Sequence, residues 1–146
     1  MKIAMASDHA GFKLKEFVKT YLQNNGNEIH DFGTYSEDSV DYPDYAYPAS
    51  QEVANGGADI GILICGTGTG MSITTNKVSG VRGANCLTPE MAELARSHNN
   101  ANVLTMGSRL IDDKTAIEIV KSFMETEFEG GRHLNRLEKI HSLTGG

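Results

Sequence analysis

Short apolar runs alternate with amphipathic stretches from one end of the chain to the other. A strand covered on both faces shows as a continuous apolar run, whereas a helix lying on a sheet shows apolar residues three or four positions apart. Five strand-like runs can be recognised, and the clearest is ADIGILIC, the third of them. The runs are residues 2–7, 27–33, 58–65, 81–87 and 102–108.

Helical patterns fill the intervals between these runs. Segment 12–25 carries apolar residues near helical spacing, and Gly26 can end this helix. The C-terminal half of the tyrosine-rich stretch 40–57 is helix-like. Proline is costly inside a helix, so the regular helix is expected to begin close to Pro48. Further helices are expected over 70–79, from the capping residue Thr88 onward, over 114–128 after a cap at Asp112 or Asp113, and as a last short helix after 129–131.

This alternation of strand and helix, repeated five times, predicts a parallel sheet with helices on both faces. Residues 1–146 show no linker or low-complexity segment, which indicates a single domain. The expected class is α/β: a three-layer αβα, Rossmann-like fold with a five-stranded parallel sheet and a C-terminal helical tail. Ligands of such folds bind beyond the carboxyl ends of the strands, so the loops there are the candidates for a site.

The loop after the third run reads ICGTGTGMSITTNK, with glycines at 66, 68 and 70. The spacing matches neither the dinucleotide fingerprint nor the phosphate-binding P-loop, whose lysine is missing. Glycines still permit unusual dihedral angles and expose backbone N–H groups at a helix start. A tight turn would need only one glycine. Three of them favour a nest for an anion, either a phosphate or an oxyanion formed during a reaction.

Cys65 ends the strand beside this nest. Buried cysteine is more often inert core. The start of a helix favours the thiolate, however, and a thiolate can act as a nucleophile or as a general base. Cys86 also ends a run, but no glycine loop follows it, so a structural role is expected there.

Two pairs of polar residues flank the first and fifth runs. Asp8 and His9 directly follow the first run, where they are either site residues or a helix cap with a surface neighbour. His98 and Asn99 end a helix directly before the fifth run. Within one chain this helix end is expected to point away from the carboxyl ends of the strands.

Cations come late in the chain. Arg109 follows the fifth run, at the edge of the expected site. Arg132 and Arg136 are four residues apart and share a helix face, which suits bidentate phosphate binding. The alternative is a solvated surface helix. His30 and His141 show no evident partners and are expected to be surface or structural residues.

Composition narrows the class of partner. The formal net charge is -6, which argues against nucleic acid or an anionic membrane as the main partner. The two cysteines have no metal-ligand spacing, so no disulfide and no metal site is expected, and a reducing compartment fits. No apolar run has the length of a signal peptide core or a membrane span. The expectation is a soluble cytoplasmic protein.

Six motifs occur in the order and spacing of the ribose-5-phosphate isomerase B family, which the sequence resembles over essentially its whole length: SDHAG, DFGTYS, DYPDYA, ILICGTGTGMSITTNK, RSHNNANVLTMGSR and EGGRHLNRLEKI. The resemblance implies an aldose–ketose isomerase without metal or other cofactor that interconverts ribose 5-phosphate and ribulose 5-phosphate. The wider family includes galactose-6-phosphate isomerase subunits and allose-6-phosphate isomerases. The galactose-6-phosphate subunits lack one or more of the Cys-Gly-Thr-Gly, His-Asn and Gly-Gly-Arg-His features, all of which are present here.

The resemblance also implies roles for single residues. Cys65 would be the base that moves a proton between C2 and C1, Thr67 would lie close to the reacting oxygens, and His98 would open the sugar ring. The backbone of Gly66 to Ser72 would hold the enediolate. The implied substrate contacts are Asp8, His9, Tyr42, Gly66, Gly68, Thr69, Gly70, Met71, Ser72 and Asn99, and the implied phosphate ligands are Arg109, Arg132, His133 and Arg136. The family forms dimers or tetramers whose sites lie between subunits, so a homodimer or homotetramer is implied.

Two other functions stay open from the sequence. One is a hexose-6-phosphate isomerase on the same scaffold, for example acting on allose 6-phosphate, because Thr69 and the pair Thr74-Thr75 stand where other members often have aliphatic or small residues. The other is a non-catalytic module that binds a sugar phosphate or a nucleotide without turning it over.

Overall fold

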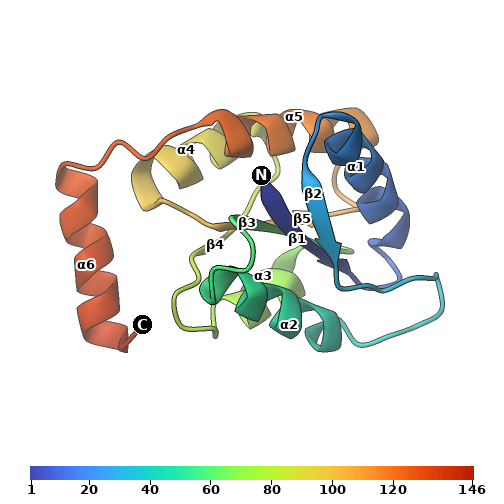
Figure 1. Ribbon diagram of the computed structural model, residues 1–146, viewed down its shortest axis with the longest axis horizontal. Helices are drawn as coiled ribbons and strands as arrows, with labels where there is room; N and C mark the ends of the chain where they lie inside the picture. The colour runs from blue at the N-terminus through green and yellow to red at the C-terminus, as the bar shows by residue number, and fades with distance from the viewer.

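Five parallel strands form the centre of the molecule, in the order β2-β1-β3-β5-β4 (Figure 1). The computed structural model describes all residues, 1–146. The strands are β1 (Lys2–Ser7), β2 (Glu28–Asp31), β3 (Ile60–Cys65), β4 (Gly83–Asn85) and β5 (Val103–Gly107). The helices are α1 (Phe12–Asn24), α2 (Pro43–Ala54), α3 (Thr69–Thr75), α4 (Pro89–Asn99), α5 (Asp113–Glu125) and α6 (Arg132–Thr144). The predicted α/β class with a five-stranded parallel sheet and C-terminal helices is confirmed.

The two faces of the sheet carry separate hydrophobic clusters, as a three-layer arrangement requires. Alternate residues of β3 point to opposite faces. Ile60, Ile62 and Ile64 pack with α1, α4 and α5, whereas Leu63 and Cys65 pack with α2 and α3. All six residues of β3 are buried, which is why this run is continuously apolar in the sequence.

The strand order reverses between β1 and β3. The chain moves from β1 outward to β2 on one side, and β3 then pairs with β1 on the other side. The crevice at such a reversal is where open α/β sheets bind ligands. Here it lies between the end of β1, followed by Asp8, and the end of β3, which is Cys65, and the Asp8 N–H donates to the Ile64 carbonyl at 3.3 Å. Strand order therefore places the two predicted strand-end residues beside each other.

The C-terminal helix α6 stands at one end of the molecule, beyond α4 and the β4 edge of the sheet (Figure 1). Its side chains His133 and Leu137 are buried. Leu134, Ile140 and Leu143 are exposed on the same helix. With 13 residues α6 is a full helix rather than the short one expected from the sequence.

Helix α2 begins at Pro43, so the prediction that it would begin close to Pro48 is wrong. Pro43 occupies the first turn, where the missing N–H costs nothing, and Pro48 lies inside the helix. Proline there removes one backbone hydrogen bond. The helix nevertheless buries Ala46 and Ala49 against the sheet, and this packing offsets the lost bond.

Several elements are shorter than their sequence patterns, among them β4 and α3. Strand β4 spans only three residues, and directly before it the Arg82 N–H donates to the Asn102 side chain, at 2.7 Å, instead of to a backbone carbonyl. Helix α3 ends at Thr75 rather than near residue 79. The Asn76 side chain donates to the carbonyls of Ser72 and Gly83, which draws the chain away from the helix and toward β4. The caps of α4 and α5 are confirmed, since Thr88 accepts from the Met91 N–H and Asp112 from the Thr115 N–H.

A fully buried lysine lies on the inner face of α1. The Lys15 ammonium group donates to both carboxylate oxygens of Asp31, at 2.7 and 2.8 Å, and Lys19 donates to the same carboxylate at 2.8 Å. The Gly33 N–H also donates to the Asp31 carboxylate, at 2.9 Å. Phe17, which belongs to the apolar pattern of this helix, is 45% exposed instead. The network links α1 to the end of β2 and to the chain that leads toward Tyr42.

His30 is not without partners, as the sequence suggested. Its two ring nitrogens lie 2.8 Å from Glu28 and 3.0 Å from Glu52, so that it links β2 to α2. These hydrogen bonds raise the pKa of His30. None of the helices combines the length and the apolar character needed to cross a membrane.

Candidate active site

Cys65 and the glycine loop form a single local unit at the end of β3. Gly68 has a φ of +81°, a left-handed conformation that suits glycine, and a Cβ atom there would collide with the Asn85 side chain. This turn directs the Gly68 N–H at the Cys65 sulfur, with a distance of 3.2 Å to Sγ. The thiol is therefore held at the mouth of the loop by a backbone donor, and it is 5% exposed.

Four backbone N–H groups of the loop that follows Cys65 have no acceptor within the chain. They belong to Gly66, Thr67, Gly70 and Met71. Backbone donors that converge without an internal partner form a site for an anion or a developing oxyanion. The sequence predicted such a nest, and the structure narrows its members.

The other amides of the loop are already used. The Gly68 N–H donates to the Cys65 sulfur, the Thr69 N–H to the Thr67 hydroxyl and the Ser72 N–H to the Gly68 carbonyl. Of the backbone from Gly66 to Ser72 that was expected to bind ligand, these three amides therefore have acceptors within the chain. The Ser72 amide makes the first hydrogen bond of α3 instead.

Asn85 supports the loop from β4, and sequence reasoning did not include it in the site. Its side-chain amide donates to the Thr67 carbonyl at 3.3 Å, and its carbonyl oxygen accepts from the buried Thr105 hydroxyl at 3.0 Å. The Asn85 side chain thus links the glycine loop to β5. The sequence does offer one clue to Asn85, because it is a polar residue at the carboxyl end of a strand. In the sheet only β5 separates that strand, β4, from β3.

Two further predicted residues contact the loop, and two more follow the end of the neighbouring strand β1. A Cβ atom on Gly70 would lie 2.6 Å from the Tyr42 ring, and one on Gly66 would lie 2.9 Å from the Arg109 guanidinium, so both side chains cover the glycines. Asp8 is buried and accepts from the Gly11 N–H at 3.0 Å. His9 accepts from the Val40 N–H through Nδ1, at 3.2 Å, which leaves Nε2 as the ring donor of the neutral imidazole. We call these residues, together with Cys65 to Ser72, the strand-end set.

The remaining predicted residues lie elsewhere, and we call them the outer set: His98, Asn99, Arg132, His133 and Arg136. Helix α4 ends at Asn99, shortly before β5 begins at Val103, which pairs with Gly61 at the start of β3. Cys65 pairs with Gly107, at the opposite end of the same strands. Four residue steps of strand separate the two ends, about 13 Å. One chain therefore does not bring His98 to Cys65.

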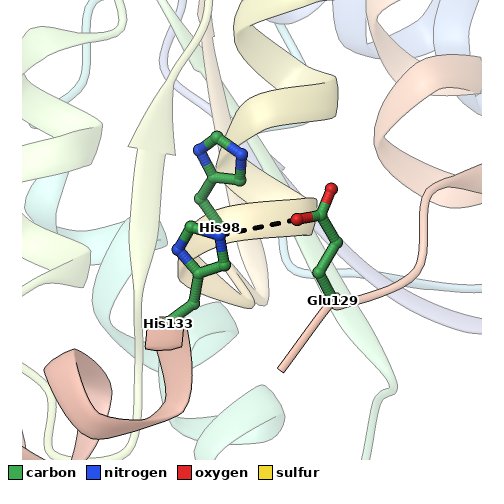
Figure 2. A group of neighbouring side chains, drawn as sticks. All are labelled: His98, Glu129 and His133. Atoms are coloured by element: carbon green, nitrogen blue, oxygen red, sulfur yellow. Dashed lines mark ion pairs between the residues drawn. The ribbon is translucent and has the colours of Figure 1, made fainter. Parts of the chain in front are cut away.

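Within the outer set the two histidines are in contact. The His98 and His133 rings stack with their centroids 4.3 Å apart, and Glu129 lies 3.5 Å from His133 (Figure 2). Arg132 and Arg136 are exposed and form no ion pair. Two unpaired guanidinium groups one helical turn apart can bind a phosphate that approaches from outside the chain.

Cys86 has the structural role expected from the sequence. It is 1% exposed in the hydrophobic cluster beside α4, and burial raises the pKa of its thiol to about 11. Such a thiol is protonated at neutral pH and unreactive. The chain thus has one buried inert thiol, and one thiol at a loop of free backbone donors.

A thiol and free backbone amides thus lie together at the switch point of a parallel α/β sheet, where ligands of such folds bind. Residues 3–140 match the model of the family described as Ribose/Galactose Isomerase. The chain belongs to this family, as its motifs indicated.

The relatives of the chain cover nearly its full length. Ribose-5-phosphate isomerase B of Escherichia coli (strain K12) is 45% identical, over 97% of this chain and 95% of the relative. The crystal structure of a ribose 5-phosphate isomerase from Thermotoga maritima is 57% identical with a TM-score of 0.95, and covers 97% of both chains. The enzyme of Mycoplasma genitalium, solved with bound ribulose 5-phosphate, is 42% identical with a TM-score of 0.94, over 99% of this chain and 96% of that chain.

Proposed function

We propose that this protein interconverts ribose 5-phosphate and ribulose 5-phosphate, a reaction of carbohydrate metabolism, by proton transfer through Cys65. The observation that carries the proposal is that the Cys65 sulfur accepts from the Gly68 N–H of a loop in which four other backbone N–H groups have no acceptor. An aldose–ketose isomerase needs both parts, a base near the carbon acid and donors where negative charge develops on oxygen. The identity to enzymes of this activity supports the choice of sugar.

The proposed chemistry balances without a redox partner. In the open-chain aldose, the Cys65 thiolate takes the proton from C2, the C–H electron pair forms the C1–C2 double bond, and the carbonyl electrons move to O1. The free N–H groups of the loop hold this oxyanion. Cys65 then returns its proton to C1, the O2–H proton passes to O1, and O2 becomes the ketone oxygen. The Thr67 hydroxyl belongs to the same loop and is exposed, which suits a contact with the two oxygens.

The outer set completes the site from a second copy of the chain. In this proposal His98 and Asn99 of one copy meet the strand-end set of another, where His98 assists ring opening. Arg109, Arg132, His133 and Arg136 bind the phosphate. A remote phosphate contact positions the reacting carbons and supplies binding energy for the transition state.

Exposed apolar side chains support such an assembly. They lie on α3, α4 and α6, the helices that carry residues of the two sets, and in the segment before α4: Ile73, Leu87, Met91, Leu94, Leu134, Ile140 and Leu143. Apolar groups that gather on neighbouring elements mark interaction surfaces. A homodimer, or a homotetramer built from such dimers, would cover them.

Mixing two inactive variants tests the shared site. Cys65→Ala and His98→Ala proteins are co-expressed, and random pairing makes half of the dimers mixed. One of the two sites in a mixed dimer has both residues intact, so about one quarter of all sites should be active. The measurement is isomerase activity of the mixture against each variant alone. Activity no higher than that of the variants alone would show that the two residues do not meet across subunits.

The substrate is tested by comparing kcat/KM for ribose 5-phosphate, allose 6-phosphate and galactose 6-phosphate. We expect the pentose phosphate to be preferred by about tenfold or more, because discrimination by even one methylene-sized group is worth about 1–3 kcal/mol. A preference for a hexose phosphate would replace the proposed substrate by that sugar. Binding of all three sugars without turnover would identify a binding module instead.

A further inference from the structure

Three potential metal ligands converge where α4, α6 and the chain before α6 meet. His98 comes from the last turn of α4, His133 from the first turn of α6, and Glu129 from the segment between α5 and α6. Figure 2 shows the two rings lying one above the other, with the carboxylate beside them. One ligand atom of each residue lies within 4.8 Å of the others, and the Glu129 carboxylate is 3.5 Å from His133 Nε2.

The donor types select a class of ion. Two imidazole nitrogens and one carboxylate oxygen suit Zn²⁺ and similar transition-metal ions, and leave a fourth position for water, whereas Mg²⁺ and Ca²⁺ prefer oxygen ligands. Two of the three ligands lie on helices, which position side chains more precisely than loops do.

The cluster needs a modest rearrangement to hold an ion. Zn–N distances are about 2.0–2.1 Å, so nitrogens bound tetrahedrally to one ion lie roughly 3.3 Å apart. The rings are nearly parallel, with 12° between their planes, so one must turn for both nitrogens to face the same ion. His98 can turn, because it is only partly buried and no hydrogen bond holds it.

The other two ligands, His133 and Glu129, are placed so that both can bind the ion once the His98 ring has turned. His133 is 6% exposed and is the fixed member of the cluster. The Glu129 side chain is 60% exposed and precedes two glycines with positive φ, Gly130 and Gly131, so that it can follow the ion. An ion placed between the carboxylate and the two rings replaces the 3.5 Å contact between Glu129 and His133 by direct coordination of both residues.

We propose that His98, Glu129 and His133 form a binding site for a Zn²⁺-class ion and that the bound ion inhibits the enzyme. The inhibition rests on the proposed function, in which His98 and His133 contact the sugar phosphate and are not available while they bind metal. The ion binding itself does not rest on it. The two parts can therefore be tested separately.

Binding is tested in Cys65→Ala protein, which removes the thiol as a competing ligand. Titration with Co²⁺, followed by its visible absorption, and with Zn²⁺, followed by calorimetry, should show one ion per chain in a tetrahedral site. Glu129→Gln and, separately, His98→Ala should weaken binding by about tenfold or more. Glu127→Gln is the matched control, because this exposed carboxylate lies two residues away and outside the cluster. Absence of stoichiometric binding, or equal binding by all these variants, would overturn the site.

Inhibition is tested in protein that retains Cys65. Zn²⁺ should reduce isomerase activity reversibly, with recovery on adding EDTA, and the Glu129→Gln protein should need about tenfold more Zn²⁺ for the same inhibition. The Glu127→Gln protein should be as sensitive as the unmodified protein. Equal sensitivity of the Glu129→Gln protein would mean that the inhibiting ion binds elsewhere, for example at the Cys65 thiol, and would refute this part of the proposal. If the chain binds Zn²⁺ but turns over no sugar phosphate, the site stands and the proposed function fails.

Discussion

Replacing Cys65 by alanine should lower kcat/KM for ribose 5-phosphate by about 10³-fold, because a positioned general base contributes about 10²–10⁴-fold. The backbone N–H groups and the arginines are unchanged by this substitution, so the sugar phosphate should still bind. Turnover is measured by following ribulose 5-phosphate formation. Binding is measured by calorimetry or by the increase in melting temperature that the ligand produces.

Two further variants distinguish the role of the Cys65 thiol as a base from its contribution to packing. Cys65→Ser keeps the size of the side chain but offers a far weaker base, so it should lose nearly as much activity as alanine. Cys86→Ala should keep the activity, because this buried thiol, with its pKa of about 11, lies in the core beside α4. Near-normal turnover by the Cys65→Ala protein would show that another group moves the proton.

Replacing Asp31 by asparagine should destabilise the fold by about 3 kcal/mol. The substitution leaves Lys15 buried without its main counter-charge, and breaking a buried ion pair from one side costs about 3–5 kcal/mol. The lower end of this range is expected because the Glu16 carboxylate still lies 3.3 Å from the Lys15 ammonium group. Urea unfolding followed by circular dichroism measures the change in the free energy of unfolding.

Replacing Lys15, the other member of the buried ion pair, as well as Asp31 should restore most of the lost stability. With Lys15→Met added to Asp31→Asn no buried charge is left, and the methionine can contact the Phe12 and Tyr35 rings, which lie 5.7 and 5.4 Å from the lysine nitrogen. Glu37→Gln is the control, because the Lys13–Glu37 pair is exposed and should contribute little. If the double variant is no more stable than Asp31→Asn alone, the uncompensated charge is not the cause of the loss.

The same carboxylate makes stability depend on pH. Burial raises the pKa of Asp31, but hydrogen bonds from Lys15, Lys19 and the Gly33 N–H outweigh burial, so that the pKa is lowered in the folded protein. A lowered pKa adds stability that is complete above the ordinary Asp value of about 4 and is lost as the pH falls through the folded value. The difference in stability between the unmodified protein and Asp31→Asn should therefore be constant near neutral pH and shrink below about pH 4.

The sequence was enough to predict the part of the candidate site that is built from neighbouring residues, namely the glycine loop with Cys65. The glycines at 66, 68 and 70 follow a continuously apolar run, and this pattern alone predicted a nest with Cys65 at its mouth. The sequence could not show that Asn85 and Thr105 brace the nest, because that contact joins three strands. Nor could it show which amides remain free, since the positive φ of Gly68 decides which N–H groups turn toward the sulfur.

Periodicity alone misread the places where tertiary contacts outweigh local preference. Lys15 is buried and Phe17 exposed on α1, because Asp31 of another strand compensates the lysine charge. Pro48 lies inside α2 because the alanines beside it pack on the sheet. In both cases a contact with a residue far along the chain supplies the stabilisation.

The sequence by itself determined the order of strands and helices, the parallel sheet and the family, because each depends on patterns or motifs that are read along the chain. Only the tertiary structure decided the strand order, which brings Asp8 beside Cys65 at the reversal between β1 and β3. The sequence had also indicated that His98 lies away from the carboxyl ends of the strands of its own chain, and the structure confirms this, so a single chain cannot use it together with Cys65. The strand order depends on the tertiary structure because strand pairing is set by packing between distant segments, and no local pattern specifies which strands become neighbours.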